Sequence, residues 1–299
     1  MSLHPDVQTI VDAIPTGSFA DVTVAEARAA HAAGSAARPP GPDLAEVTEL
    51  DLGGCPTTRY RPAGADGAAA VFLHGGGWVI GSRQTHDGTC RYLAEHSGVT
   101  IYSVEYRLAP EHPFPAAYDD AVAATGALLG GAESGVDPTR IAVAGDSAGG
   151  NLAAAAALAL REGSLPPLRA QLLVYPALDA SMGLASHQEF ADGPVLTAKE
   201  MGRFWDQYAP DADRSDWRLS PLAANDLSEL PATLVITASH DVLRDEGEAY
   251  AQALASAGVE ASAARQLGAA HGFFGWFHAT APSRAAMAQA GAWLRRQLT

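Results

Sequence analysis

The stretch of sequence that decides the fold is IAVAGDSAGG, residues 141–150. Its first four residues are an apolar run typical of a buried strand, and a helical stretch begins at Ala148. Between them, Gly145, Ser147 and Gly149 form a Gly-x-Ser-x-Gly turn. Only glycine fits beside so tight a turn, which pushes the serine hydroxyl out above the edge of a sheet. The sequence therefore predicts Ser147 as a nucleophile.

On both sides of this turn, apolar runs alternate with helical stretches. Such alternation predicts an α/β fold with a mostly parallel central sheet flanked by helices on both faces. A short hairpin is expected to add two antiparallel strands, 46–52 and 57–61, at one edge of the sheet. The remaining strands are expected at residues 69–73, 100–104, 141–144, 171–175, 233–237 and 261–266. The flanking helices are expected at residues 83–96, 116–129, 148–161, 244–257 and 283–298.

Two segments interrupt this alternation. The first 45 residues contain helical stretches, 6–13 and 23–33, but no strand-like run, and between Asp179 and Pro221 there is one helical piece, 197–208. An insertion of that length at the carboxyl edge of a parallel sheet is usually functional. We therefore expect a helical cap over the active site, made of residues 1–45 and 181–217. The core then comprises residues 46–180 and 218–299.

A glycine-rich loop, His74-Gly75-Gly76-Gly77-Trp78, follows the strand expected at 69–73. Glycine lets backbone N–H groups point into a cavity that a side chain would block. The amides of Gly75, Gly76 and Ala148 are predicted to bind the oxyanion of a tetrahedral intermediate. His74 is interpreted as holding the loop in place, because it follows the wrong strand to serve as the base.

A serine hydroxyl needs a base that accepts its proton and a carboxylate that orients that base. His271 directly follows the last expected strand, where the base is needed, and Asp241 follows the strand before it. We predict these two residues as base and acid. Asp245 and Glu246 are interpreted as acids of a first helical turn, favoured there by the helix dipole. The other histidines after Ser147 are predicted to be non-catalytic, with His187 in the cap, His240 at a strand end and His278 on a helix surface.

The ordered motifs resemble those of the bacterial hormone-sensitive-lipase-like esterases, specifically the branch with the elbow sequence GDSAG. The motifs are HGGG at 74–77, YRLAPEHPFPAA at 106–117, the elbow at 145–150, Tyr175-Pro176 and the segment 241–246. The resemblance extends from about Leu44 to the C-terminus and is weaker before it. It implies an α/β-hydrolase fold with a cap built from an N-terminal arm and an insertion.

Position by position, the resemblance implies that Ser147 is the nucleophile, Asp241 the acid and His271 the base. It also implies that Gly75, Gly76 and Ala148 are the oxyanion donors. One departure is that Val242 stands where the family usually has proline after the acid.

Composition narrows the range of partners. There are 19 Lys+Arg against 34 Asp+Glu, a formal net charge of −15. Nucleic acids and anionic membranes both require a cationic surface, so neither is expected as a partner. The longest apolar stretch, residues 152–160, is far shorter than the about 20 residues of a membrane span.

The cysteines and the first residues bear on the compartment. Cys55 and Cys90 have no metal-binding or CxxC spacing, and residues 1–10 lack the basic residues that begin a signal peptide. The sequence thus predicts a cytoplasmic protein with two reduced thiols.

The predicted function is a serine carboxylesterase that hydrolyses neutral esters of short to medium chain length through an acyl-enzyme on Ser147, without metal or cofactor. Arg107 and Glu111 are interpreted as structural ion-pairing residues rather than catalytic ones. Two alternatives remain open: an amidase or formamidase on the same fold, and a non-catalytic receptor-like binding module. A monomer and a homodimer both fit the resemblance.

Six aromatic residues lie in the expected cap or in the loop after the base. They are expected to build an apolar pocket or to pack in the core: Phe190, Phe204, Trp205, Phe273, Phe274 and Trp276.

Overall fold

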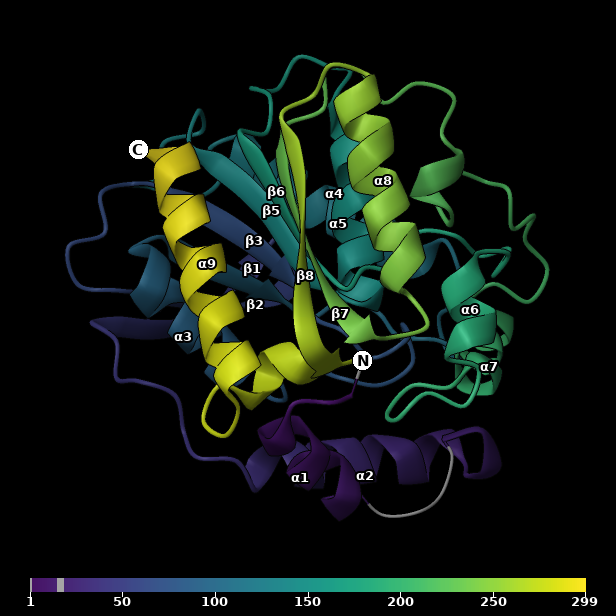
Figure 1. Ribbon diagram of the computed structural model, residues 1–299. Coiled ribbons are helices and arrows are strands. Elements are labelled where there is room, and N and C mark those ends of the chain that lie inside the picture. Colours follow the sequence, from purple (N-terminus) through teal and green to yellow (C-terminus); the bar gives the residue numbers. More distant parts are fainter. Residues whose placement is uncertain (1, 15–18) are drawn as a thin grey trace.

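The computed structural model describes residues 2–14 and 19–299 (Figure 1). Met1 and residues 15–18, which belong to the predicted N-terminal cap segment, lie outside the described residues. Within the described part, eight strands form one sheet in the order β1-β2-β4-β3-β5-β6-β7-β8. The strands are β1 (Glu46–Leu52), β2 (Cys55–Arg61), β3 (Ala69–Leu73), β4 (Thr100–Val104), β5 (Ile141–Asp146), β6 (Ala170–Val174), β7 (Ala232–His240) and β8 (Ala261–Ala270).

The pairing is antiparallel only at one edge of this sheet. β1 pairs with β2 and β2 with β4 in antiparallel register, whereas the pairs from β4 to β8 are parallel. All carboxyl ends of the parallel strands therefore meet at one edge, where ligands bind in open α/β sheets. The predicted hairpin and the predicted parallel sheet are both confirmed.

Helices cover the sheet on both faces (Figure 1). On one face lie α3 and α9, which pack against each other, and on the other face lie α4, α5 and α8. The nine α-helices of the described residues are α1 (Pro5–Ala13), α2 (Val24–Ala36), α3 (Asp87–Ser97), α4 (Ala116–Leu129), α5 (Ala148–Leu160), α6 (Ala185–Glu189), α7 (Ala198–Tyr208), α8 (Arg244–Ser256) and α9 (Ala281–Leu298). Three 3₁₀ turns accompany them: η1 (Phe19–Asp21), η2 (Pro221–Ala223) and η3 (Phe273–Trp276).

The hydrophobic core is divided by the sheet into two clusters. Along β3, Val71 and Leu73 belong to one cluster, and Ala70 and Phe72 belong to the other. This alternation follows from the period of two along a strand. Every residue of β3 is buried, which explains why an inner strand reads as a continuous apolar run rather than an alternating one.

Most element bounds agree with the sequence-based expectation, and the differences have local causes. β7 and β8 continue beyond their apolar runs, with a register shift between Ala238 and His240, because their pairing carries on to Ala270. α3 begins at Asp87 rather than at residue 83, because Ser82 and Thr85 exchange hydrogen bonds in a turn before it. The five-residue helix α6 was not expected, since it is too short to show a helical period.

The N-terminal segment and the insertion meet each other beside the carboxyl edge of the sheet. The rings of Phe19 and Phe204 stack with their centroids 4.3 Å apart, and Arg203 donates a hydrogen bond to the Phe19 carbonyl at 3.0 Å. Lys199 forms an ion pair with Asp21 at 2.9 Å. α7 and η1 are thus held together. No helix within the described ranges has the length and apolar character needed to cross a bilayer.

Candidate active site

Ser147 lies between β5 and α5, at the turn predicted from the sequence. Its backbone has φ +55° and ψ −119°, an unusual conformation for a residue other than glycine. A Cβ on Gly145 would lie 2.2 Å from the Gly149 carbonyl oxygen, and one on Gly149 would lie 1.9 Å from the Leu73 carbonyl oxygen. Side chains at these positions are therefore excluded. The turn is also held by the Ser147 N–H, which donates a hydrogen bond to the Val174 carbonyl oxygen at 2.8 Å.

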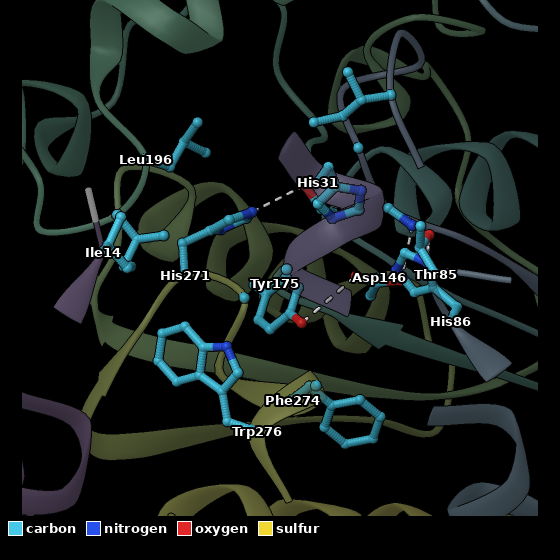
Figure 2. A pocket seen from close by; sticks show the side chains of 18 of the residues that line it. Ile14, His31, Thr85, His86, Asp146, Tyr175, Leu196, His271, Phe274 and Trp276 are labelled. Atoms are coloured by element: carbon cyan, nitrogen blue, oxygen red, sulfur yellow. Dashed lines mark hydrogen bonds and ion pairs between the residues drawn. The ribbon is translucent and has the colours of Figure 1, made fainter. Parts of the chain in front are cut away.

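A continuous chain of hydrogen bonds links the three residues predicted as a triad. His271 Nε2 lies 3.0 Å from Ser147 Oγ, and His271 Nδ1 lies 2.8 Å from Asp241 Oδ2 (Figure 2 labels His271). Asp241 is only 1% exposed, and its other oxygen accepts the Leu243 N–H at 3.0 Å. Carboxylate, imidazole and hydroxyl are thus in the order that lets the histidine accept the serine proton.

The sheet explains why residues so far apart in the sequence meet here. Asp241 directly follows β7, His271 directly follows β8, and Ser147 directly follows β5. The three strands run parallel, so the three residues emerge at the same edge. Gly272, with φ +77°, then turns the chain into η3. The ring of Tyr175 lies 4.7 Å from the His271 ring and restricts its position.

The glycine-rich loop after β3 differs from expectation at one position. The Gly75 N–H donates a 2.8 Å hydrogen bond to the Asp146 carboxylate, so it is not free to bind an oxyanion. A Cβ at Gly75 would also lie 2.5 Å from Asp146 Oδ2. The predicted assignment of Gly75 as an oxyanion donor therefore conflicts with this geometry. Gly76 and Gly77, with φ +125° and +58°, line the same pocket as Ser147.

His74 is completely buried under this loop. Its ring stacks on Tyr106 at a centroid distance of 4.2 Å, and its Nδ1 lies 2.9 Å from the Gly75 carbonyl oxygen. The Tyr106 hydroxyl donates to the His74 carbonyl at 2.7 Å. Burial, reinforced by the nearby His86, lowers the pKa of His74 to about 3. His74 is thus a neutral packing residue of the loop, in agreement with its interpretation from the sequence.

A second aspartate–histidine pair, missed by the sequence analysis, includes Asp146, the residue directly before Ser147. His86 Nε2 is 3.3 Å from Asp146 Oδ1, and the Tyr175 hydroxyl is 3.5 Å from Asp146 Oδ2 (Figure 2). Burial opposes ionisation of Asp146, but His86 and the Gly75 N–H hold the pKa of this carboxyl below its usual value. The position of Asp146 inside the elbow was the available signal, but nothing in the sequence pointed to His86 as its partner.

The pocket in front of Ser147 has a volume of about 690 Å³. Of the six aromatic residues considered from the sequence, Phe204, Phe274 and Trp276 line it (Figure 2 labels the last two). The other three pack elsewhere: Phe190 beside His240, Trp205 on Trp78 and Phe273 on Tyr175. Further apolar lining residues lie in α1, directly after α1 and α2, and in the segment before α7: Ile10, Ile14, Ala37, Val195 and Leu196.

Comparison with known proteins agrees with this geometry. Residues 70–275 match the family model described as the alpha/beta hydrolase fold. The chain is 42% identical over 254 residues to the carboxylic ester hydrolase LipN of Mycobacterium tuberculosis, covering 80% of this chain and 67% of LipN. It is 39% identical to an ethyl acetate hydrolase of Pseudomonas putida, over 91% of this chain and 92% of that protein. The crystal structure of a thermostable esterase from P. putida superposes with a TM-score of 0.93 at 38% identity, covering 100% of this chain and 98% of that one.

The chain belongs to the α/β hydrolase family. The resemblance to the hormone-sensitive-lipase-like esterases and the predicted fold are thereby confirmed.

Two charged residues of the hydrolase were interpreted from the sequence as structural. Arg107 pairs with Asp120 at 2.7 Å and Glu111 with Arg28 at 2.7 Å, so both are ion-pairing residues as predicted.

The two acids that open α8 in the hydrolase have different surroundings. Asp245 pairs with Arg244 at 2.7 Å and accepts the Ser186 N–H at 2.9 Å. Glu246 is only 1% exposed and accepts the Asp179 N–H at 3.1 Å. Its complete burial, together with the charge of Asp179, raises the pKa of Glu246 well above the ordinary range. Glu246 is therefore more than a solvated first-turn acid, which the sequence did not reveal.

Two other predictions concern His278 and the cysteines. His278 lies in the turn between η3 and α9 and lines the pocket, so its assignment to a helix surface is wrong. Cys55 and Cys90 are both free and buried. No cluster of His, Cys, Asp and Glu that could hold a metal ion occurs among the residues that the structure describes.

Proposed function

We propose that this hydrolase cleaves neutral carboxylic esters of short to medium acyl chain length through an acyl-enzyme on Ser147, with His271 as base and Asp241 as the orienting acid. The chain is a carboxylic ester hydrolase. The acyl preference and the residue roles are the proposed part. The observation that carries them is the hydrogen-bonded chain from Asp241 through His271 to Ser147 at the wall of a largely apolar pocket.

The reaction then has two halves. In the first, Ser147 Oγ attacks the ester carbonyl carbon while its proton passes to His271 Nε2, and the leaving alcohol takes that proton as the carbon–oxygen bond breaks. In the second, His271 accepts a proton from water as the water oxygen attacks the acyl carbon. The proton returns to Ser147 Oγ as the carboxylic acid leaves. Asp241 orients the imidazole and stabilises its protonated form.

We assign the oxyanion site to the amides of Gly76, Gly77 and Ala148. Gly76 and Ala148 keep their predicted role, and Gly77 takes the place of Gly75. All three glycines line the pocket, and the assignment is supported by the hydrogen bond that occupies the Gly75 N–H. Each such donor contributes about 3 kcal/mol to transition-state stabilisation in related chemistry.

We further propose that residues 1–45 and 181–217 act as the cap of this site. The contacts between η1 and α7 support this division, as do the pocket-lining residues contributed by α1, α2 and α7. A cytoplasmic location remains a proposal, supported by two free buried thiols in a chain without a disulfide among its described residues. A monomer or homodimer is likewise proposed.

Hydrolysis of a p-nitrophenyl ester series, from acetate to palmitate, tests the proposal. We expect kcat/KM to peak between acetate and octanoate and turnover to vanish in Ser147→Ala, because the nucleophile is lost. A preference for palmitate would contradict the proposed chain length, and residual turnover in the variant would contradict the role of Ser147. The matched anilides serve as the second arm, since faster cleavage of amides than of esters would identify an amidase instead.

A further inference from the structure

The pocket contains a cation that the proposed mechanism does not use. Arg38 follows α2 and lines the pocket, and its Nη1 contacts the Gly275 carbonyl oxygen only at a long 3.4 Å. Among the described residues, no carboxylate forms an ion pair with it. A guanidinium usually reaches carboxylates through two parallel hydrogen bonds, so a half-buried one without such a partner retains unused donors.

The acids of the same pocket have other partners. Asp146 accepts the Gly75 N–H and lies beside His86. Glu200 caps α7 through Thr197 and accepts the Phe19 N–H at 2.8 Å. Asp146 acts on Arg38 through its charge, but neither acid forms an ion pair with Arg38 among the described residues.

A second polar group without a partner lies on the same wall. The Nδ1 atom of His31, on α2, is buried, and no hydrogen-bond partner for it occurs among the described residues (His31 is labelled in Figure 2). Burial, followed by the charges of His86 and Arg38, lowers the pKa of His31 to about 4, so the ring is neutral at neutral pH. A neutral imidazole can donate one hydrogen bond from Nδ1 in the appropriate tautomer.

We propose that Arg38 and His31, which line the same pocket as Ser147, form a subsite for a second carbonyl or carboxylate oxygen of the ester substrate. The His31 Nδ1 atom without a partner and the unused donors of Arg38 lie in a pocket that is otherwise largely apolar, and buried polar groups without partners are costly. An acceptor oxygen on the substrate would satisfy both. Because the subsite shares one pocket with Ser147, this inference rests on the proposed function and specifies its substrate class.

Matched pairs of esters test the subsite. Diethyl succinate, glutarate and adipate are compared with ethyl heptanoate, octanoate and nonanoate, which have the same chain length but lack the second ester group. kcat/KM is measured by titration of the released acid at constant pH and halved for the two equivalent groups of each diester. We expect the diester to be preferred over its alkyl counterpart for at least one length, by about 10- to 100-fold, the effect of a hydrogen bond to a charged donor.

Arg38→Met removes the charge and the donors but keeps the length of the side chain. We expect it to abolish the selectivity ratio of diester over alkyl ester, and Arg38→Lys to restore part of it. His31→Phe should lower the ratio less, because it removes a neutral donor. Arg296→Met, at the exposed C-terminal end of α9, is the matched control and should leave the ratio unchanged.

The outcomes separate the two proposals. If Arg38→Met lowers kcat/KM for both ester classes equally, Arg38 has a structural role only and the subsite is disproved. The subsite is also disproved if the wild type cleaves neither the diesters nor the half-ester monoethyl adipate faster than the alkyl esters. In that case Ser147→Ala still abolishes turnover, so the proposed function stands. Half-esters cleaved faster than diesters identify a carboxylate as the occupant, and the reverse order identifies a carbonyl. Turnover that survives Ser147→Ala would instead contradict the proposed function itself.

Discussion

The protein contains two aspartate–histidine pairs, Asp241–His271 and Asp146–His86, and they differ in what the histidine contacts. In the first, Asp241 holds His271, whose other nitrogen is 3.0 Å from the serine hydroxyl. In the second, His86 contacts Asp146, whose carboxylate holds the Gly75 N–H of the glycine-rich loop. In our proposal the same two residue types serve proton transfer in one place and hold a loop in the other. The contacts of each pair, not its residue types, are the basis for this distinction.

Loss of the serine that the first pair contacts gives the largest expected effect. Ser147→Ala should lower kcat by about 10⁴- to 10⁶-fold, because His271 then has no hydroxyl to activate. The measurement is kcat for p-nitrophenyl butyrate, with circular dichroism to verify that the variant is folded. Retention of most of the activity would show that the elbow has been assigned wrongly.

Substitution of the first aspartate comes next. Asp241→Asn should lower kcat by about 10⁴-fold, because an amide cannot hold His271 in the tautomer that accepts the serine proton. Asp245→Asn is the matched control, four positions further on and paired with Arg244 instead. Its loss should be far smaller under the same assay. The reverse order would transfer the role of the acid to Asp245.

The second pair should matter less. Asp146→Asn keeps an acceptor for the Gly75 N–H but removes the charge facing His86, so the loop is loosened rather than lost. We expect kcat to fall by about 10- to 100-fold, less than for removal of an oxyanion donor, with little change in KM. A loss as large as that of Asp241→Asn would break the distinction between the two pairs and make Asp146 a participant in proton transfer.

The smallest effect concerns stability at acid pH. His74 stays neutral in the folded protein down to about pH 3, whereas the unfolded chain binds a proton near pH 6.5. The unfolded state therefore gains protons first, and stability that is complete above pH 6.5 declines as the pH falls. We expect up to about 1.4 kcal/mol per pH unit from this residue between pH 6 and 4.

Urea unfolding of the wild type and of His74→Gln over this pH range measures the contribution. The variant should be less stable at neutral pH but show a shallower loss on acidification. Parallel pH curves for the two proteins would contradict the assignment of His74 as a buried neutral group. His31 should add to the same decline, because the pKa of His31 is also lowered, to about 4.

The sequence alone determined the features that depend on local chemistry. The elbow at 145–150 fixed the place of Ser147, since a turn so tight leaves no alternative to glycine at its flanks. The apolar runs fixed the parallel strands, because inner strands are buried on both faces. Chain order after Ser147 then pointed to Asp241 and His271, whose contacts have the predicted pattern.

Tertiary structure alone decided which side chains from distant segments contact one another. The Gly75 N–H donates a hydrogen bond to the Asp146 carboxylate, which belongs to a different strand, and this bond is the reason that we propose Gly77 instead of Gly75 as an oxyanion donor. The pairing of His86 with Asp146 depends on a turn 60 residues before the elbow. Arg38 and His31 reach the pocket only because the N-terminal segment packs against the η3 loop and the insertion. Local patterns encode strands, turns and helix starts, whereas contacts between segments depend on how the completed layers pack, which no local pattern specifies.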